Sequence, residues 1–200
     1  MYHLRVEDVA AFILAGGKST RMGADKALLD LGGRTLLARA LELARSVTRE
    51  VRIVGPATKF AAFGPVVEDV YCGHGPLSGI HAALASTASE WNLMLALDLP
   101  FLEAGFLRYL IAEARAGGAV VTVPRAAGGL QPLCAVYRRE FAEVAEHSLR
   151  QEKNKIDVLF AQVETQVIGE EQLVRASFSE EMFRNLNTQE EWERAKLRHK

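Results

Sequence analysis

Short apolar runs alternate with longer amphipathic stretches along most of the 200 residues of this chain. This alternation is typical of βαβ units, in which parallel strands are joined by helices that cover the sheet. The first run, Val9 to Ala15, is almost unbroken, as expected for a strand buried on both faces. The chain is therefore predicted to be an α/β protein with a largely parallel sheet.

The remaining elements are predicted from apolar periodicity and from the turn residues between the runs. Further strands are expected at 51–54, 66–67, 93–97, 119–123, 133–137 and 165–168, and helices at about 36–44, 80–86, 102–116 and 141–149. The glycine-rich stretch 73–79 is expected to be a loop. Thr188 and Glu191 have the spacing of a capping box, which predicts a C-terminal helix. One compact domain covering 1–200 is expected at this length.

The composition excludes several classes of protein. Apolar residues make up 49% and charged residues 24%, which is typical of a globular chain. A net charge of -1 lacks the basic excess of a nucleic-acid-binding groove. The acidic N-terminal segment and the lack of an apolar run of about 18 residues predict no membrane targeting. The two cysteines, Cys72 and Cys134, are too few for a disulfide framework, so a cytoplasmic location is expected.

A glycine-rich turn follows the first strand. Gly16 and Gly17 let the backbone bring its N–H groups close to a phosphate or a base, and Arg21 and Lys26 supply cations for phosphate oxygens. This combination predicts an anion-binding loop. Lys18 stands where a dinucleotide fingerprint has its second glycine, and no stretch supplies a Walker A loop. A plain turn with solvated charges is the alternative.

Two carboxylates follow predicted strands, where ligands bind in open α/β sheets. Asp98 comes after the most apolar run and could hold Mg²⁺ that bridges triphosphate oxygens, or it could simply begin the turn before Pro100. Asp69 could accept two N–H donors from a guanine edge, or it could cap the following loop.

A further set of residues has weaker chemical meaning. Cys72 and His74 form a Cys-x-His pair, but no second pair at ligand spacing supports a metal site. Cys134 is expected in the core. The loop at 73–79 could bring its backbone close to a ligand, or it could be a mobile connection.

The segment from Leu14 to Lys26 resembles the signature of the molybdenum cofactor guanylyltransferases, including the acidic residue directly before the lysine. Other resemblances lie at Glu68-Asp69, 75–79, Asp98-Leu99-Pro100, Gln131-Pro132-Leu133 and Asn185-Leu186-Asn187-Thr188. The resemblance implies a three-layer Rossmann-like nucleotidyltransferase fold. It also implies Mg²⁺-dependent transfer of GMP from GTP to molybdopterin or the molybdenum cofactor, with release of pyrophosphate.

The resemblance further implies a role for each matching position. The guanine nucleotide would be contacted by Leu14, Ala15, Gly16 and Gly17. Its base would be recognised by Asp69 and its phosphates by Lys26. Asp98 would bind nucleotide and hold the Mg²⁺.

The resemblance implies that the catalytic residues are Arg21, Lys26 and Asp98. Asn185 and Asn187 would contribute to the pterin side of the cleft. The implied partners are GTP, molybdopterin or molybdenum cofactor, and transiently a cofactor-insertion protein or molybdoenzyme chaperone. A monomer is expected, with neither nucleic acid nor membrane as a partner.

One position departs from the family pattern. Val54-Gly55-Pro56 stands where many relatives have an asparagine that helps to bind nucleotide, so that contact is either lost or made by backbone. The turn reads Ala-Gly-Gly where related cytidylyltransferases tend to have Ala-Ala-Gly, which favours GTP over CTP. The alternatives are transfer from CTP, another phosphorylated acceptor, or a nucleotide-binding protein without catalysis.

Overall fold

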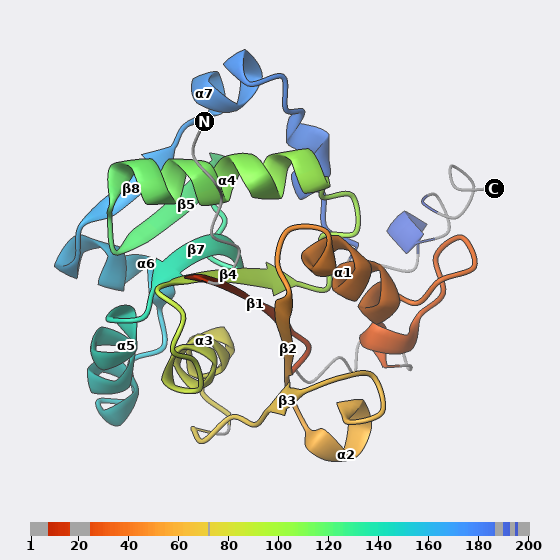
Figure 1. The fold of residues 1–200 in the computed structure, drawn as a ribbon, viewed down its shortest axis with the longest axis horizontal. Coiled ribbons are helices and arrows are strands. Elements are labelled where there is room, and N and C mark those ends of the chain that lie inside the picture. The colour runs from red at the N-terminus through yellow and green to blue at the C-terminus, as the bar shows by residue number, and fades with distance from the viewer. Residues whose placement is uncertain (1–7, 17–24, 72, 187–189, 193–194, 196–200) are drawn as a thin grey trace.

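A central sheet with helices on both faces forms the body of the protein (Figure 1). The structure, a computed structural model, describes residues 8–16, 25–71, 73–186, 190–192 and 195. Within these residues eight strands form the sheet, in the order β3-β2-β1-β4-β7-β5-β6, and β8 pairs with β5. No helix in these ranges is both long and apolar enough to cross a bilayer.

The strands are β1 (Val9–Leu14), β2 (Glu50–Val54), β3 (Val66–Val67), β4 (Trp91–Ala96), β5 (Val121–Ala126), β6 (Gly129–Leu130), β7 (Cys134–Arg138) and β8 (Thr165–Ile168). β1 is parallel to β2 and β4, whereas β7 is antiparallel to both β4 and β5. β5 therefore runs in the same direction as β4. The prediction of a mostly parallel sheet is confirmed, and the carboxyl ends of β1 to β5 lie at one edge.

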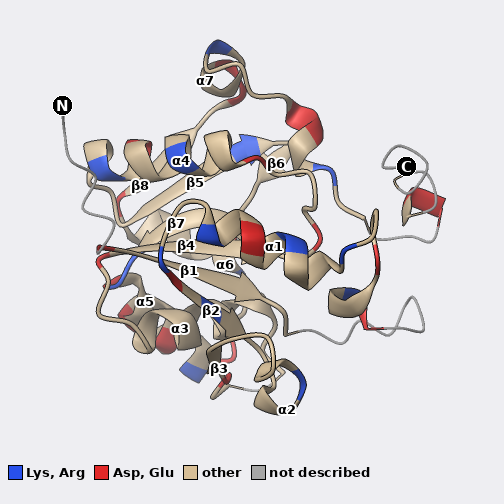
Figure 2. Cartoon of the chain, turned by 45° about the vertical axis from the view of Figure 1, so that its right-hand side comes forward, with Lys and Arg blue, Asp and Glu red and all other residues tan. Residues whose placement is uncertain are grey.

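The helices are α1 (Leu36–Arg45), α2 (Ala57–Phe60), α3 (Pro76–Ala85), α4 (Ala104–Gly117), α5 (Phe141–Arg150), α6 (Ile156–Leu159) and α7 (Glu170–Arg175). α1 and α4 cover one face of the sheet, and α3 and α5 cover the other (Figure 1). Basic and acidic residues occur together on α1 and on α7 (Figure 2). The three-layer α/β prediction is confirmed.

The apolar character of the first strand follows from its place between two cores. Ala11 and Ile13 pack into the core beneath α1 and α4, and Ala10 and Phe12 pack into the core beneath α3 and α5. All four side chains are fully buried. A period-two alternation of apolar and polar residues would leave one of these cores with a polar face.

The predicted loop at 73–79 is wrong in its second half, because α3 begins at Pro76. The preceding Gly75 has φ 73°, and proline fits the first helical position since its missing N–H has no partner there. Within α3, a Cβ on Gly79 would lie 3.5 Å from the side chains of Leu14 and Val54. The helix therefore packs closely on the ends of β1 and β2. Thr188, half of the predicted capping box, lies outside the described residues.

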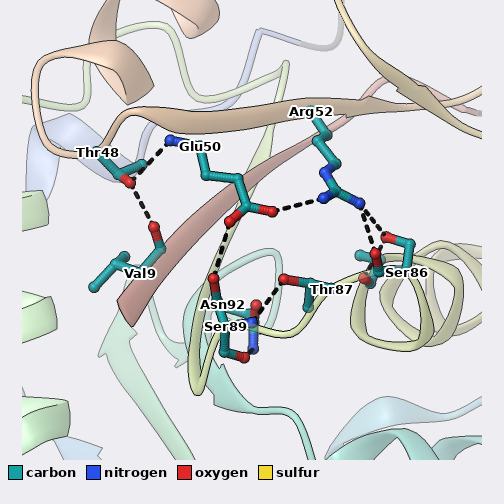
Figure 3. A network of polar contacts seen from close by, with 9 residues as sticks. Val9, Thr48, Glu50, Arg52, Ser86, Thr87, Ser89 and Asn92 are labelled. Atoms are coloured by element: carbon teal, nitrogen blue, oxygen red, sulfur yellow. Dashed lines mark hydrogen bonds and ion pairs between the residues drawn. The ribbon is translucent and has the colours of Figure 1, made fainter. Parts of the chain in front are cut away.

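A polar network closes the opposite edge of the sheet, where the strands begin (Figure 3). The Glu50 carboxylate accepts hydrogen bonds from the Arg52 guanidinium at 2.8 Å and from the Ser89 hydroxyl at 3.0 Å. Arg52 also donates to the Ser86 carbonyl at 2.6 Å, and Thr48 donates to the first residue of β1. These bonds tie β2 to the connection between α3 and β4.

Candidate functional site

Lys26 and Asp98 meet at the carboxyl edge of the sheet. Lys26 begins a short 3₁₀ helix, Lys26–Leu28, and Asp98 follows β4. The pairing of Leu14 with Ala96 places the ends of β1 and β4 side by side, and Ala27, next to Lys26, is buried in the core beneath α1 and α4. The Lys26 Nζ lies 3.6 Å from the Asp98 Oδ2, and the two side chains are 18% and 32% exposed. A ligand can therefore reach both groups.

The glycine-rich turn is bonded to the sheet. The N–H groups of Ala15 and Gly16 both donate to the Val54 carbonyl, at 2.9 and 3.0 Å. A Cβ on Gly55 would lie 2.9 Å from the Phe60 ring and 3.3 Å from the Gly16 nitrogen, so glycine permits this close approach. The N–H groups of the turn were expected to face a ligand. At Ala15 and Gly16 they are instead hydrogen-bonded to the end of β2.

The position of the missing asparagine also lies at this contact, and the loss of its nucleotide contact, or its replacement by backbone, stays a prediction. At this place in the chain, the main-chain carbonyl of Val54 bonds to the turn. Leu14 is half-buried at the end of β1, so the described part of the predicted nucleotide turn stands at the strand end as expected. Gly17 and Arg21 lie outside the described residues.

Asp69 is held by the loop that it begins. Its Oδ1 accepts a hydrogen bond from the Tyr71 N–H at 2.9 Å, and its Oδ2 accepts one from the Ser78 hydroxyl at 2.5 Å. Ser78 lies in the first turn of α3 and is buried. Asp69 thus caps this loop, one of its two predicted roles. Each carboxylate oxygen can accept more than one hydrogen bond, so capping is compatible with ligand recognition.

The loop is also anchored to the helix beside α3. The Tyr71 hydroxyl donates to the Glu146 carboxylate on α5 at 3.2 Å, and the His74 Nδ1 lies 3.3 Å from the Asn154 Oδ1. Hydrogen bonds from Arg150 and Tyr71 hold the pKa of Glu146 below its usual value. Tyr71 precedes the stretch 73–79, which was predicted either to bring its backbone close to a ligand or to be a mobile connection. Within that stretch His74 contacts Asn154, which sequence periodicity could not indicate.

The C-terminal segment joins the site through the backbone of Asp98. The Leu186 N–H donates to the Asp98 carbonyl at 3.2 Å. Leu186 is fully buried in a small cluster that includes Leu31, Leu36 and Trp192. Asn185 is exposed next to this contact, and its role on the pterin side stays a prediction. Asn187 lies outside the described residues.

The donors suit a cation that arrives with a nucleotide. The described residues include no group of three or more His, Cys, Asp or Glu side chains that could hold a metal. Mg²⁺ commonly takes one or two carboxylates and completes its shell with phosphates and water, so Asp98 alone fits such an ion.

Cys134 lies in the core as predicted, and burial raises the pKa of its thiol far above the usual value.

A profile of the MobA-like NTP transferase domain matches residues 11–166. The chain belongs to this family. The matched region begins within β1, contains Lys26, Asp69 and Asp98, and extends into β8. It therefore covers the carboxyl edge described above, apart from the C-terminal contact at Asp98.

Individual relatives agree with this assignment. This MobA-like chain is 38% identical to a probable molybdenum cofactor guanylyltransferase from Pelotomaculum thermopropionicum, over 92% of this chain and 90% of the relative. It is 35% identical to a protein of the same name from Carboxydothermus hydrogenoformans, over 94% and 95%. The structure of molybdopterin-guanine dinucleotide biosynthesis protein A from Archaeoglobus fulgidus superposes with a TM-score of 0.83 at 27% identity, over 94% of this chain and 97% of the other.

Proposed function

We propose that this protein transfers GMP from GTP to the terminal phosphate of molybdopterin or the molybdenum cofactor and releases pyrophosphate. The observation that carries the proposal is the meeting of Lys26 and Asp98 at the carboxyl edge, 3.6 Å apart and open to ligand. It occurs in a chain that is similar over 92% of its length to a probable molybdenum cofactor guanylyltransferase.

The proposed reaction needs no activated side-chain nucleophile. An oxygen of the acceptor phosphate attacks the α-phosphorus of GTP, and the bond from that phosphorus to the bridging oxygen of the β-phosphate breaks. The electron pair of that bond leaves with pyrophosphate. A phosphate monoester is largely dianionic at neutral pH, its second pKa being about 6, so a general base is dispensable. The main barrier is the repulsion between two anions.

Lys26 and Asp98 are suited to lower this barrier. Lys26 neutralises charge on the triphosphate, and the 3.6 Å ion pair with Asp98 holds its ammonium at the strand edge before the nucleotide binds. Mg²⁺ held by Asp98 would supply further neutralisation of the triphosphate. Arg21 would add a third cation.

Asp69 is proposed to read the guanine base. Guanine presents two N–H donors to a carboxylate and adenine lacks this pair, so Asp69→Ala should lower the preference for GTP over ATP. Hydrogen bonds to charged groups contribute about 1.5–3 kcal/mol, which corresponds to a loss of about 10- to 100-fold in the ratio of the two Kd values. Isothermal titration with both nucleotides measures this ratio.

Ser78→Ala is the matched control, because it removes one hydrogen bond to Asp69 and leaves the carboxylate. This variant should keep most of the preference for GTP. If Asp69→Ala retains the wild-type ratio, Asp69 only caps the loop, and guanine is recognised elsewhere.

The activity itself is tested by incubating the full chain with GTP, Mg²⁺ and molybdopterin. Pyrophosphate release and the mass of the dinucleotide product are measured. We expect both with GTP and much less with CTP. Faster reaction with CTP contradicts the assignment of guanine, and product with another phosphorylated acceptor alone contradicts the assignment of molybdopterin. Nucleotide binding without pyrophosphate from any acceptor indicates a non-catalytic protein.

A further inference from the structure

Lys59 is linked to the phosphate-site lysine through Asp25. The Lys59 Nζ donates to the Asp25 Oδ2 at 2.6 Å. The other oxygen of Asp25 accepts from the Ala27 N–H at 3.2 Å and caps the 3₁₀ helix that begins with Lys26. One carboxylate therefore joins Lys59 to the turn that carries Lys26.

Lys59 itself lies on an anchored element. α2 lies beside β3 (Figure 1), and its Phe60 is buried against Gly55 at the end of β2. The Ala57 N–H at the start of α2 donates to the Glu68 carboxylate at 2.9 Å. These contacts fix α2 relative to the strand ends, so the Lys59 backbone is a stable point from which to hold Asp25.

From this arrangement we infer that Lys59 is a positioning residue, which acts through Asp25 to aim Lys26 at the triphosphate. The inference rests on the proposed function. Asp25 is the immediate neighbour of Lys26, and without a counter-ion its negative charge would compete for the Lys26 ammonium and repel incoming phosphates. Lys59 cancels this charge and holds the carboxylate in its capping orientation.

The effect of removing Lys59 is small but measurable. Its side chain is 56% exposed and that of Asp25 is 23% exposed. Exposed ion pairs contribute about 0.2–1 kcal/mol, which converts to at most about a fivefold change in rate. Lys59→Met, which keeps an unbranched side chain one atom shorter and removes the charge, should lower kcat for GTP about two- to fivefold. The loss is expected in kcat because a displaced Lys26 ammonium stabilises the charged transition state less well.

Variants at both ends of the pair separate positioning from other roles. Lys59→Arg keeps the charge and should restore most of the lost kcat. Asp25→Asn removes the charge of the carboxylate and keeps an oxygen that can cap the turn. If Lys59 acts through Asp25, adding Lys59→Met to Asp25→Asn causes no further loss. Losses that multiply show that Lys59 contacts the substrate itself and overturn the inference.

Arg175→Met is the matched control. Arg175 forms an exposed ion pair with Glu171 on α7, where the two side chains are 78% and 88% exposed. This variant should retain wild-type kcat, and thermal melting should show that all the variants remain folded.

The wild-type reaction separates failure of the inference from failure of the proposed function. An active wild type whose kcat is unchanged by Lys59→Met overturns the role of Lys59 and leaves the proposed function in place. A wild type that releases no pyrophosphate from GTP and molybdopterin overturns the proposed function, and the role of Lys59 with it.

Discussion

Asp98→Asn is expected to lower kcat by about 100- to 1,000-fold, the range seen when one group that stabilises transition-state charge is removed. Asparagine keeps the size of the side chain and one oxygen but loses the charge that would hold Mg²⁺ against the triphosphate. The fold should persist because the side chain is 32% exposed and the bond to Leu186 uses the backbone carbonyl of Asp98. Pyrophosphate release in the steady state gives kcat, and thermal melting reports the fold.

Asp8→Asn is a suitable control for this experiment. Asp8 is exposed and directly precedes β1, at the edge of the sheet opposite the site. Its replacement should leave kcat unchanged. Turnover of Asp98→Asn within about tenfold of the wild type would mean that Asp98 supplies less than about 1.4 kcal/mol and is not the metal ligand.

Asn92→Asp should destabilise the fold by about 3–5 kcal/mol near neutral pH, as expected for an uncompensated buried charge. Asn92 is fully buried in β4, and its amide nitrogen donates to the carbonyls of Ser89, Glu90 and Tyr137 at 3.1, 3.3 and 3.3 Å. An ionised aspartate would direct a negative oxygen at these carbonyl oxygens and remove the bonds that the amide donates to them. Urea unfolding measures the loss of stability.

The pH dependence of the Asn92→Asp variant follows from the same environment. Burial and the three carbonyls favour the neutral carboxyl, so the pKa of this new group is raised in the folded state. The contribution of its neutral form to stability is present below the unfolded pKa of about 3.9 and is lost as the pH rises. The variant should therefore be less destabilised near pH 4 than near pH 8, relative to the wild type at each pH. An equal loss at both pH values would show that the charge is not the cause.

Asn154→Asp is the matched control. Asn154 is exposed, so the new charge remains in water. Its effect on unfolding should stay within about 0.5 kcal/mol.

Apart from the two-residue β6, which was not predicted, the strands were predictable because each carries its signal within a few residues. Ala10 to Ile13 are apolar at every position since the two faces of β1 meet separate cores. α2, α6 and α7 were not predicted, because helices of four to six residues are too short to show a helical period. The start of α3 was misplaced because glycine and proline indicate a loop, although proline also suits a first helical turn.

The candidate site was predictable to the extent that it depends on strand ends. Lys26 and Asp98 were selected because they follow β1 and β4, and the pairing of these strands brings them together. The contact between Lys59 and Asp25 depends on where α2 packs, which no local pattern determines. The anchoring of Tyr71 by Glu146 likewise joins residues that only the packing of α3 and α5 brings close.

The reversed direction of β7 places the start of this strand beside the end of β4. The Ala96 N–H donates to the Leu133 carbonyl at 2.8 Å, so the segment that leads into β7 is hydrogen-bonded through its main chain to the end of β4. Such bonds do not depend on side-chain identity. The strand end that precedes Asp98 is therefore held from both sides, by β1 and by β7, whatever side chains the neighbouring positions carry.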